Sequence, residues 1–188
     1  MGAGRPRDAR IDAAVLAAAA ELVVKVGYRK LSLAAIAERA GTTKTALYRR
    51  WSGKTELVHD LVFAHMTRLP PSSGEVADDL RAMIESAGDL FAGPVARAAL
   101  PGLIADMSAD PDLAGRVHAG FANVFDAVRE RLVVAVERGE VHPDVDPDRL
   151  IEVIGGSAML HALMLRDGEF DDTWADRLSA IVMHGVLR

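Results

Sequence analysis

The stretch GTTKTALYRRWSGK, Gly41 to Lys54, decides the fold of this chain. Leu47 and Trp51 are four residues apart, so on a helix they share one face, which we expect to be the inner one. The outward positions hold a cation, a hydroxyl and a phenol, which suit base edges and phosphate oxygens. These outward residues are Lys44, Thr45 and Tyr48.

A tight glycine turn is predicted to join this helix to a shorter one before it. Ser32 is expected to cap the first helix, which Gly41 ends, and Thr43 is expected to cap the second. Two short helices joined in this way predict a helix-turn-helix, whose second helix lies in the major groove of DNA. Basic residues extend the positive surface toward the flanking phosphates, and the accessible N-terminus of the next helix favours phosphate as well. These basic residues are Arg49, Arg50 and Lys54.

Charge is distributed unevenly along the chain. Up to Leu69 there are twelve Lys/Arg against six Asp/Glu, whereas from Pro70 onward there are ten against twenty-one, within a formal net charge of −5. A basic N-terminal third attached to an acidic remainder indicates one end that faces a polyanion and a separate body. We therefore expect a helix-turn-helix domain with a basic arm over residues 1–52 and a helical body over residues 53–188.

Composition excludes several kinds of site. Half of the 188 residues are hydrophobic, so the chain can bury a sizeable core. There is no cysteine, which excludes disulfides, thiolate zinc sites, iron–sulfur clusters and a cysteine nucleophile. This composition fits a reducing cytoplasm, and the sequence indicates no metal and no cofactor.

The N-terminal segment superficially resembles a signal peptide, because arginines precede the apolar run AAVLAAAA (Ala13–Ala20). Asp8 and Asp12 lie in the region that should be positive, however, and Glu21 ends the apolar run. Apolar residues instead recur at helical spacing from Ile11 to Val26, so we expect an amphipathic helix. No apolar stretch reaches the ~20 residues that a membrane span needs.

The chain is predicted to be all-α, with about nine helices. β-branched alternation is absent, and the segment LPPSSGE (Leu69–Glu75) is the strongest break, because two prolines end any helix. A single apolar stripe from Leu113 to Val136 predicts one long helix. The other helices beyond the break are expected at about 75–92, 94–108, 147–166 and 172–187.

The segment Leu31–Val58 resembles the DNA-binding signature of the tetracycline-repressor (TetR) family of bacterial regulators. The usual form is a Ser/Thr-capped helix, then IA..AG, a hydroxyl cap, LY, an aromatic residue and K..L. Weaker similarity covers the N-terminal GRPRD and, farther on, ADPDLAGRV, RGEVHPDVDPDRL and IGGSAMLHALML, so the likeness spans most of the chain. The positions of the signature are filled here by Ile36-Ala37, Ala40-Gly41, Thr43, Leu47-Tyr48, Trp51, Lys54 and Leu57.

This resemblance implies a homodimer with an N-terminal three-helix DNA-binding domain and a C-terminal ligand-binding and dimerisation domain. An effector bound in the C-terminal domain would move the two reading heads apart and release a palindromic operator in double-stranded DNA. The expected function is therefore that of a repressor of transcription. The sequence departs from the family pattern at Thr42, Ala46 and Arg50, which bears on the operator sequence and not on the mode of binding.

The predicted DNA contacts have simpler alternatives. On composition alone Arg49-Arg50 is a solvated helix face, but the surrounding turn, cap and aromatic residues favour DNA. Ser32 and Thr43 are helix caps first, and Arg5 and Arg7 are either a groove-contacting arm or a solubilising tail. The full predicted set is Ser32, Thr43, Lys44, Thr45, Tyr48, Arg49, Arg50, Lys54, Arg5 and Arg7.

Methionine and aromatic residues of the acidic body are expected to be core first. The alternative is that some line a pocket for a mainly hydrophobic small molecule, since such side chains make adaptable apolar walls. The candidates for this effector pocket are Met83, Met107, His118, Phe121, Phe125 and Met159.

Small residues, GGSA at Gly155–Ala158, allow close helix approach and predict a two-fold four-helix interface. The alternative is that the same face belongs to a core within one chain. The predicted interface residues are Ile154, Ala158, His161, Leu165, Trp174, Leu178 and Ile181.

Two other classes of function are weighed against a DNA-binding regulator. An enzyme is disfavoured because the sequence contains no nucleophile elbow, glycine-rich phosphate loop or HExxH, and the densest polar group (Glu140, His142, Asp144) lies in a proline-rich loop. A helical ligand- or protein-binding module without DNA binding would keep the fold but lose the outward basic positions, which this chain retains. We therefore expect a sequence-specific transcriptional regulator and not an enzyme.

Overall fold

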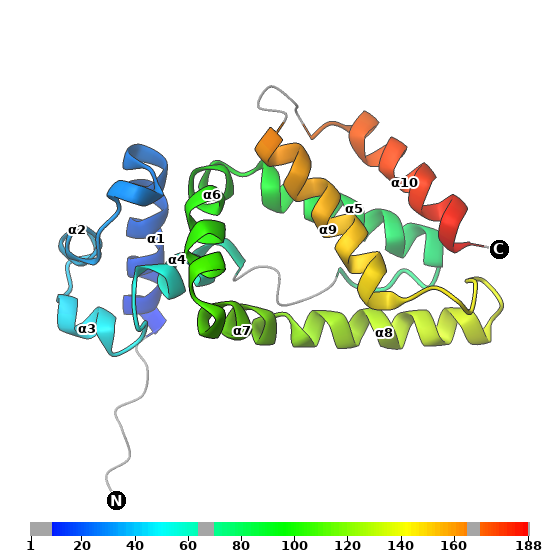
Figure 1. Cartoon of the computed structure of the whole chain (residues 1–188), viewed down its shortest axis with the longest axis horizontal. Coiled ribbons are helices and arrows are strands. Elements are labelled where there is room, and N and C mark those ends of the chain that lie inside the picture. Colours follow the sequence, from blue (N-terminus) through cyan, green and yellow to red (C-terminus); the bar gives the residue numbers. More distant parts are fainter. Residues whose placement is uncertain (1–8, 64–69, 165–169, 188) are drawn as a thin grey trace, which may run out of the picture. The chain divides into compact units, whose positions relative to one another are not determined.

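The computed structural model describes residues 9–63, 70–164 and 170–187, and these residues form ten α-helices and one short 3-10 turn (Figure 1). The only β-type pairing among them is an isolated bridge between Val141 and Leu187. The predicted all-α class is therefore confirmed.

The chain divides into two compact units. Unit 1 comprises Met1–Ala64 together with Ala98–Leu113, and unit 2 comprises His65–Arg97 together with Ala114–Arg188. Unit 1 therefore extends past residue 52, which is the domain boundary expected from the sequence, and it also takes in a segment from much later in the chain.

Four N-terminal helices and a short turn build most of unit 1. Helix α1 supplies an inward stripe at Val15, Ala19 and Val23, and the turn η1 buries Tyr28. Helices α2, α3 and α4 add apolar residues to the same core, because α1 packs against both α2 and α4. The bounds are α1 Ala9–Val26, η1 Tyr28–Lys30, α2 Leu33–Arg39, α3 Lys44–Tyr48 and α4 Lys54–Phe63.

The helix-turn-helix is held by the caps that the sequence predicts. The Ser32 hydroxyl accepts a hydrogen bond from the Ala35 amide (3.2 Å), and the Thr43 hydroxyl accepts one from the Ala46 amide (3.1 Å). Between the two helices Gly41 has φ +65°, a left-handed conformation in which glycine avoids the steric cost of a side chain. Both predicted caps and the predicted glycine turn are confirmed.

Part of helix α6 (Pro94–Ala109) completes the core of unit 1. A Cβ atom on Gly102 would lie 2.2 Å from Cδ1 of Tyr28, so the ring of Tyr28 packs directly on the helix backbone. The Tyr28 hydroxyl donates a hydrogen bond to Asp106 and lies 3.2 Å from Oγ1 of Thr55, which itself donates to Asp106 Oδ2 (3.0 Å). We call Tyr28, Thr55, Gly102 and Asp106 the Tyr28 cluster.

Helix α5 is the central element of unit 2, because it packs against both α9 and α10, while α8 packs against α9. Its buried residues, among them Leu80, Ile84 and Phe91, recur at helical spacing. The bounds are α5 Val76–Ala92, α7 Pro111–Gly120, α8 Ala122–Glu137, α9 Pro147–Met164 and α10 Asp172–Val186.

The prediction of a single long helix between Leu113 and Val136 is wrong. It is divided at Phe121 into α7 and α8, because the Phe121 amide bonds to the His118 carbonyl three residues back (3.0 Å) instead of continuing the α-helical pattern. The division follows Gly120, a weak helix former. The apolar stripe continues across the break, which is why periodicity alone does not reveal it.

Among the described segments, no single helix is long and apolar enough to cross a membrane. Only α5 and α6 taken together across the bend between them have the required length and composition.

Candidate DNA-binding surface and effector cavity

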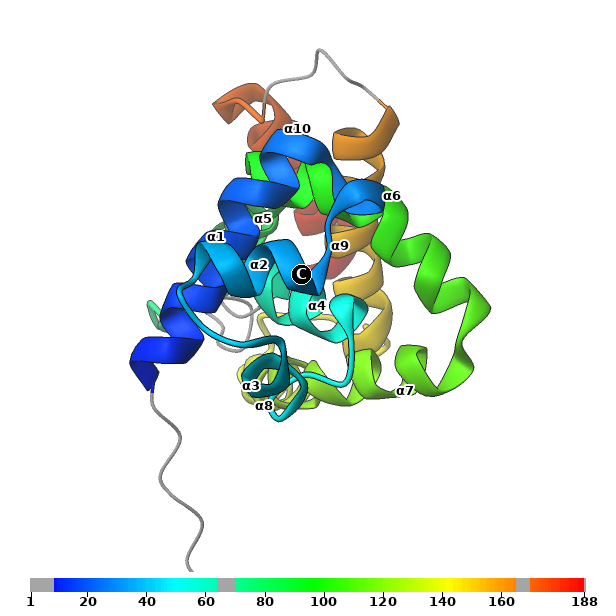
Figure 2. The same cartoon turned by 90° about the vertical axis from the view of Figure 1, so that its left-hand side faces the viewer.

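Helix α3 follows α2 after a short turn (Figure 2). It presents exposed basic and polar side chains on one face and buries the other. Leu47 is fully buried and Trp51 nearly so, and the indole Nε1 of Trp51 donates to Asp60 Oδ2 (2.8 Å). Tyr48 on the opposite face is 51% exposed, and its ring lies 5.6 Å from Nζ of Lys44. We call the exposed set the recognition ridge; it consists of Thr43, Lys44, Thr45, Tyr48 and Arg49.

Arg50 does not belong to this ridge, although the sequence placed it among the DNA contacts. Its guanidinium forms an ion pair with Asp12 of α1 and donates to the Ala46 carbonyl (3.1 Å), and its side chain is only 16% exposed. A guanidinium used in this way secures α3 to α1. We therefore correct its predicted role from DNA contact to structural support.

Lys54 is also directed inward. Its ammonium group donates to the Tyr28 carbonyl (3.3 Å) and lies 4.2 Å from the centre of the Tyr28 ring. The N-terminus of α4, expected to attract phosphate, is instead occupied by the Glu56 carboxylate, which accepts bonds from the Ser52 amide and hydroxyl (2.6 Å each). Because Lys54 points inward and Glu56 occupies the start of α4, the exposed positive charge lies on the recognition ridge and not at the start of α4.

The remaining predicted DNA contacts have mixed outcomes. Ser32 is exposed, but its hydroxyl is used as a cap at the start of α2. Thr43 is exposed and caps α3 at the ridge itself. Arg5 and Arg7 lie outside the described residues, so their role stays a prediction.

The Tyr28 cluster shifts the acidity of its phenol. Burial raises the pKa of the Tyr28 hydroxyl well above its ordinary value, and the hydrogen bond to Asp106 together with the negative charge of that carboxylate raises it further. The phenol is therefore neutral at physiological pH and serves as a hydrogen-bond donor that joins η1 to α6 within unit 1.

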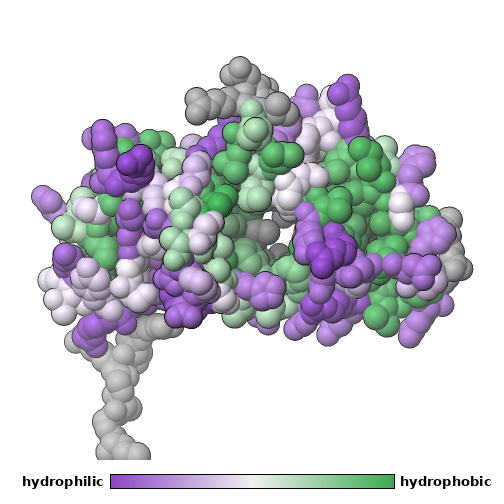
Figure 3. Space-filling view, in the orientation of Figure 1, coloured by the Kyte–Doolittle hydropathy of each residue, from purple (hydrophilic) through white to green (hydrophobic). Residues whose placement is uncertain are grey.

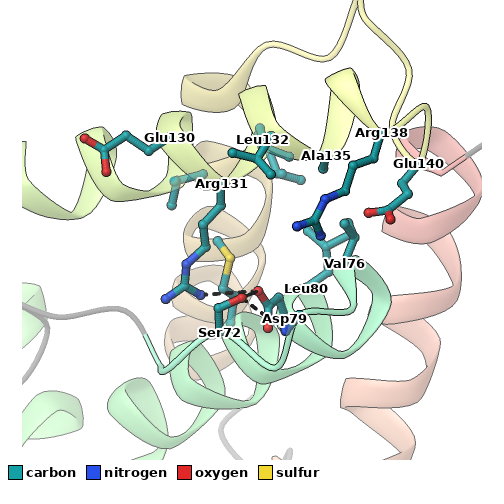
Figure 4. A pocket seen from close by; sticks show the side chains of 15 residues that line it. Ser72, Val76, Asp79, Leu80, Glu130, Arg131, Leu132, Ala135, Arg138 and Glu140 are labelled. Carbon is teal, nitrogen blue, oxygen red and sulfur yellow. Dashed lines mark hydrogen bonds and ion pairs between the residues drawn. The ribbon is translucent and has the colours of Figure 1, made fainter.

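Unit 2 contains a cavity of about 300 Å³ between α5, α8 and the start of α9 (Figure 4). This volume lies at the lower end of the roughly 300–1,000 Å³ typical of small-molecule sites. Charged side chains from α8, from the loop after it and from α5 line the rim. The apolar wall consists of Val76, Leu80, Met83, Val128, Leu132, Ala135 and Leu150.

An arginine and a carboxylate face each other at one side of this cavity. Arg131 donates to the Pro70 carbonyl, and its Nη1 lies 3.7 Å from Asp79 Oδ2, beyond hydrogen-bond distance. Burial alone would raise the pKa of the Asp79 carboxyl, but hydrogen bonds from Ser72 and Ser73 and the charge of Arg131 outweigh that effect and hold this pKa below its ordinary value. Asp79 is thus an ionised carboxylate whose acceptor capacity is used by the chain itself.

Only Met83 of the six predicted pocket residues lines this cavity. Met107 belongs to unit 1, and His118 is exposed with its ring 5.8 Å from that of Phe125. The other three predicted residues, Phe121, Phe125 and Met159, are half-buried elsewhere in unit 2.

The sequence reasoning missed the charged lining of the cavity. Arg131 and Arg138 are seven residues apart on one face of the same helical segment, and this spacing was a signal that was available. Charged residues at this spacing usually form a solvated helix face, so the pattern alone does not predict a cavity.

The predicted dimer interface must be corrected. Ile154, Ala158 and Leu178 are buried in the core of the single chain, so they are not available to a second copy. The rings of His161 and Trp174 pack with each other, and Trp174 approaches α5 so closely that a Cβ on Gly88 would lie 3.1 Å from it. Leu165 lies outside the described residues, and of the predicted set only Ile181 is strongly exposed, at 71%.

A different face of α9 is exposed and apolar. Leu160 is 61% exposed, and with Ile181 of α10 it belongs to a set of large hydrophobic side chains open to solvent. Figure 3 shows hydrophobic patches on the surface of unit 2. We call this set the α9–α10 stripe; it consists of Val153, Leu160, Met164 and Ile181.

The described segments contain no group of three or more His, Cys, Asp or Glu side chains arranged to hold a metal ion. His142 and Asp144, members of the only polar group weighed as catalytic, are exposed in the loop before α9.

A capped helix-turn-helix with an exposed basic ridge, attached to a helical unit with a ligand-sized cavity, is the arrangement of a DNA-binding transcriptional regulator. Residues 15–61 match the family described as "Bacterial regulatory proteins, tetR family", and residues 70–182 match "Tetracyclin repressor-like, C-terminal domain". The chain belongs to the TetR family.

Known proteins agree with this assignment along nearly the whole chain. A protein of Mycobacteroides abscessus named DNA-binding transcriptional repressor TetR is 31% identical over 94% of this chain and 93% of its own length. The uncharacterised HTH-type transcriptional regulator YdeS of Bacillus subtilis is 27% identical over 97% of this chain and 93% of its own length. The solved structure of the TetR family transcription regulator SCO0332 aligns with a TM-score of 0.71 and 30% identity, covering 95% of this chain and 99% of that one.

Proposed function

We propose that this regulator is a homodimeric repressor that binds a palindromic operator through the recognition ridge and leaves it when a small molecule occupies unit 2. The observation that carries the proposal is a contrast at α3: Leu47 of the helix and Trp51 just after it are buried, whereas the cation, hydroxyls and phenol on the opposite side are exposed. Acting on DNA, it would work in the bacterial cytoplasm. The repressor role is supported by the name of the M. abscessus relative.

The DNA-binding part of the proposal is tested with two duplexes, one from the region upstream of the gene and one of random sequence. Affinity for both should fall steeply with salt, because bound arginine and lysine displace counterions from phosphates. Lys44→Ala should weaken the upstream duplex more than the random one, by about 1–3 kcal/mol of discrimination, if its ammonium contacts a base edge. Arg49→Ala should weaken both alike and reduce the salt slope by about one unit.

Lys25→Ala is the matched control, because Lys25 is an exposed lysine in the last turn of α1, outside the ridge. It should leave both affinities nearly unchanged. If the wild-type protein bound neither duplex at low salt, the alternative of a helical binding module without DNA binding would replace the proposal.

The homodimer is supported by the α9–α10 stripe, whose four large apolar side chains have no cover in the single chain. Exposed apolar area of this kind is typical of a surface that is buried in an assembly. A second copy of the chain is the occupant that the two-fold symmetry of a palindromic operator requires.

The response to an effector is proposed as a population shift. A ligand that binds one conformation of unit 2 better than the other changes operator affinity by the difference between its two binding free energies and by no more. Helix α6 is a covalent connection between the two units, because its residues 94–97 belong to unit 2 and its residues from 98 onward belong to unit 1.

A further inference from the structure

We propose that the cavity between α5, α8 and α9 binds a small apolar acid, with its hydrocarbon part against the apolar wall and its carboxylate facing Arg131 and Arg138. This inference rests on the proposed function, because it names the chemical class of the effector. Apolar side chains line the cavity on two sides. They come from positions 76, 80 and 83 of α5 and from positions 128, 132 and 135 of α8. Such a wall favours a hydrocarbon body over a polar one.

Arg131 supplies the first unsatisfied donor. Its Nη1 is buried and has no hydrogen-bond partner among the described residues, although its other terminal nitrogen donates to the Pro70 carbonyl. A buried donor without an acceptor costs free energy until an acceptor reaches it. A planar guanidinium is also the side chain best suited to a carboxylate, because it donates two parallel hydrogen bonds.

Arg138 supplies the second cation. It lies two turns beyond Arg131, and Figure 4 shows its guanidinium directed from the end of α8 toward Val76, on the cavity side. The side chain of Arg138 is exposed and forms no hydrogen bond or ion pair within the described parts of the chain. Two guanidinium groups thus face the same small volume from one helix face.

The acidic residues at the rim do not cancel this preference. Asp79 already accepts bonds from Ser72 and Ser73, and Figure 4 shows Glu130 directed away from the cavity. Glu140 lies on the same side as Arg138 and offsets one positive charge, while its buried Oε2 has no hydrogen-bond partner among the described residues. Asp79 and Glu140 therefore balance the two guanidinium charges, and the preference for an acid rests on hydrogen-bond donors: the free Nη1 of Arg131 and the unpaired guanidinium of Arg138 can donate to a carboxylate but not to an ammonium group.

The test uses three probes with the same eight-carbon body: octanoate, 1-octanol and octylammonium. Each is titrated by calorimetry into the full-length protein without DNA, at one pH and one salt concentration. Octanoate should bind at least about tenfold more tightly than either of the others, because only the carboxylate gains charge-assisted hydrogen bonds from the arginines.

Arg138→Gln is the decisive variant, because Arg138 has no partner in the described chain and its loss should leave the fold intact. It should weaken octanoate binding roughly 10-fold or more and leave octanol binding unchanged. Arg131→Gln should do the same, with circular dichroism and thermal unfolding to check folding, since Arg131 also holds Pro70. Arg129→Gln, on the same helix but paired with Asp126 and Asp148 outside the cavity, is the control and should change nothing.

Three results would overturn the proposal: octanol or octylammonium binding as tightly as octanoate, no binding of any probe, or unchanged octanoate affinity in Arg138→Gln. Because no DNA is present, these results are independent of operator binding. A protein that binds its operator but not octanoate would refute the effector class alone. A protein that binds octanoate yet no duplex would refute the proposed function and leave the site standing.

Discussion

Arg49 and Arg50 are neighbours in the chain with opposite environments. Arg49 is exposed at the end of the recognition ridge, whereas Arg50 is folded back onto Asp12 of α1 and the Ala46 carbonyl. Arg49 is therefore free to bind a phosphate, whereas Arg50 holds α3 against α1.

Arg50→Ala should lower the free energy of unfolding by about 1–3 kcal/mol, because it leaves the half-buried Asp12 carboxylate without its counter-charge. Chemical denaturation with urea measures this loss. Arg49→Ala is the matched variant and should change stability by less than about 0.5 kcal/mol. A stability loss of equal size in both variants would contradict this division of roles.

Sequence reasoning treated the two arginines alike for a physical reason. The partner of Arg50 is 38 positions away along the chain, and no local pattern reports such a distant ion pair. The inward position of Trp51 was predictable, because it depends only on helical spacing from Leu47.

Tyr28→Phe should reduce the free energy of unfolding by about 1–2 kcal/mol at neutral pH, because Asp106 loses a hydrogen-bond donor. The folded pKa of Tyr28 is raised above the ordinary value of 10.0, so the stabilisation from this phenol is complete below pH 10 and is lost as the pH rises further. The stability difference between wild type and Tyr28→Phe should therefore shrink above pH 10. Denaturation curves from pH 7 to pH 11 check this, and a constant difference would contradict it.

At the scale of the element, α6 packs closely against Tyr28 because Gly102 has no side chain. A glycine inside a helix ordinarily costs roughly 0.5–1 kcal/mol relative to alanine. At Gly102 the balance is reversed, because a Cβ atom would overlap the Tyr28 ring.

Gly102→Ala should therefore destabilise the protein, by about 1–3 kcal/mol, as expected for overpacking. Gly115→Ala in α7 provides the contrast, because a Cβ there meets nothing within 4 Å, and it should stabilise by roughly 0.5–1 kcal/mol. Thermal unfolding of both variants measures the two signs. An increase in stability for Gly102→Ala would show that Tyr28 does not pack on α6 as described.

Most elements were predictable because their ends carry local chemistry. Ser32, Gly41 and Thr43 each act within three or four residues, so the helix-turn-helix was recognisable from sequence alone. The division at Phe121 was not, since the apolar stripe runs through it. The cavity depends on how α5 and α8 face each other. The residue pattern of a single helix does not predict that arrangement.

At the scale of the whole molecule, the α9–α10 stripe should join two copies. Leu160→Glu should raise the dimer dissociation constant about 100-fold or more, because an unpaired carboxylate would be buried in an apolar interface. Sedimentation velocity over a range of concentrations measures this. Val133→Glu is the control, since Val133 is an exposed valine on α8 outside the stripe, and it should leave the dimer intact. A stable dimer of Leu160→Glu would exclude this surface.

The sequence placed the end of the DNA-binding domain near residue 52, where the basic charge and the family signature end. The compact unit that contains the helix-turn-helix also includes α4 and the segment Ala98–Leu113. The contacts that extend it, such as that between Tyr28 and Asp106, join residues 78 positions apart. Neither the charge distribution nor a local motif predicts a contact between residues so far apart in the sequence.

This late contribution has a consequence for synthesis on the ribosome. When the first 64 residues have been translated, Gly102 and the buried Leu100 and Leu103 of α6 do not yet exist, so the part of the Tyr28 ring that packs on α6 is uncovered. The N-terminal unit reaches its finished form only after Leu113 has left the exit tunnel. A nascent or truncated product that stops before Ala98 therefore lacks a wall of the core that supports the helix-turn-helix.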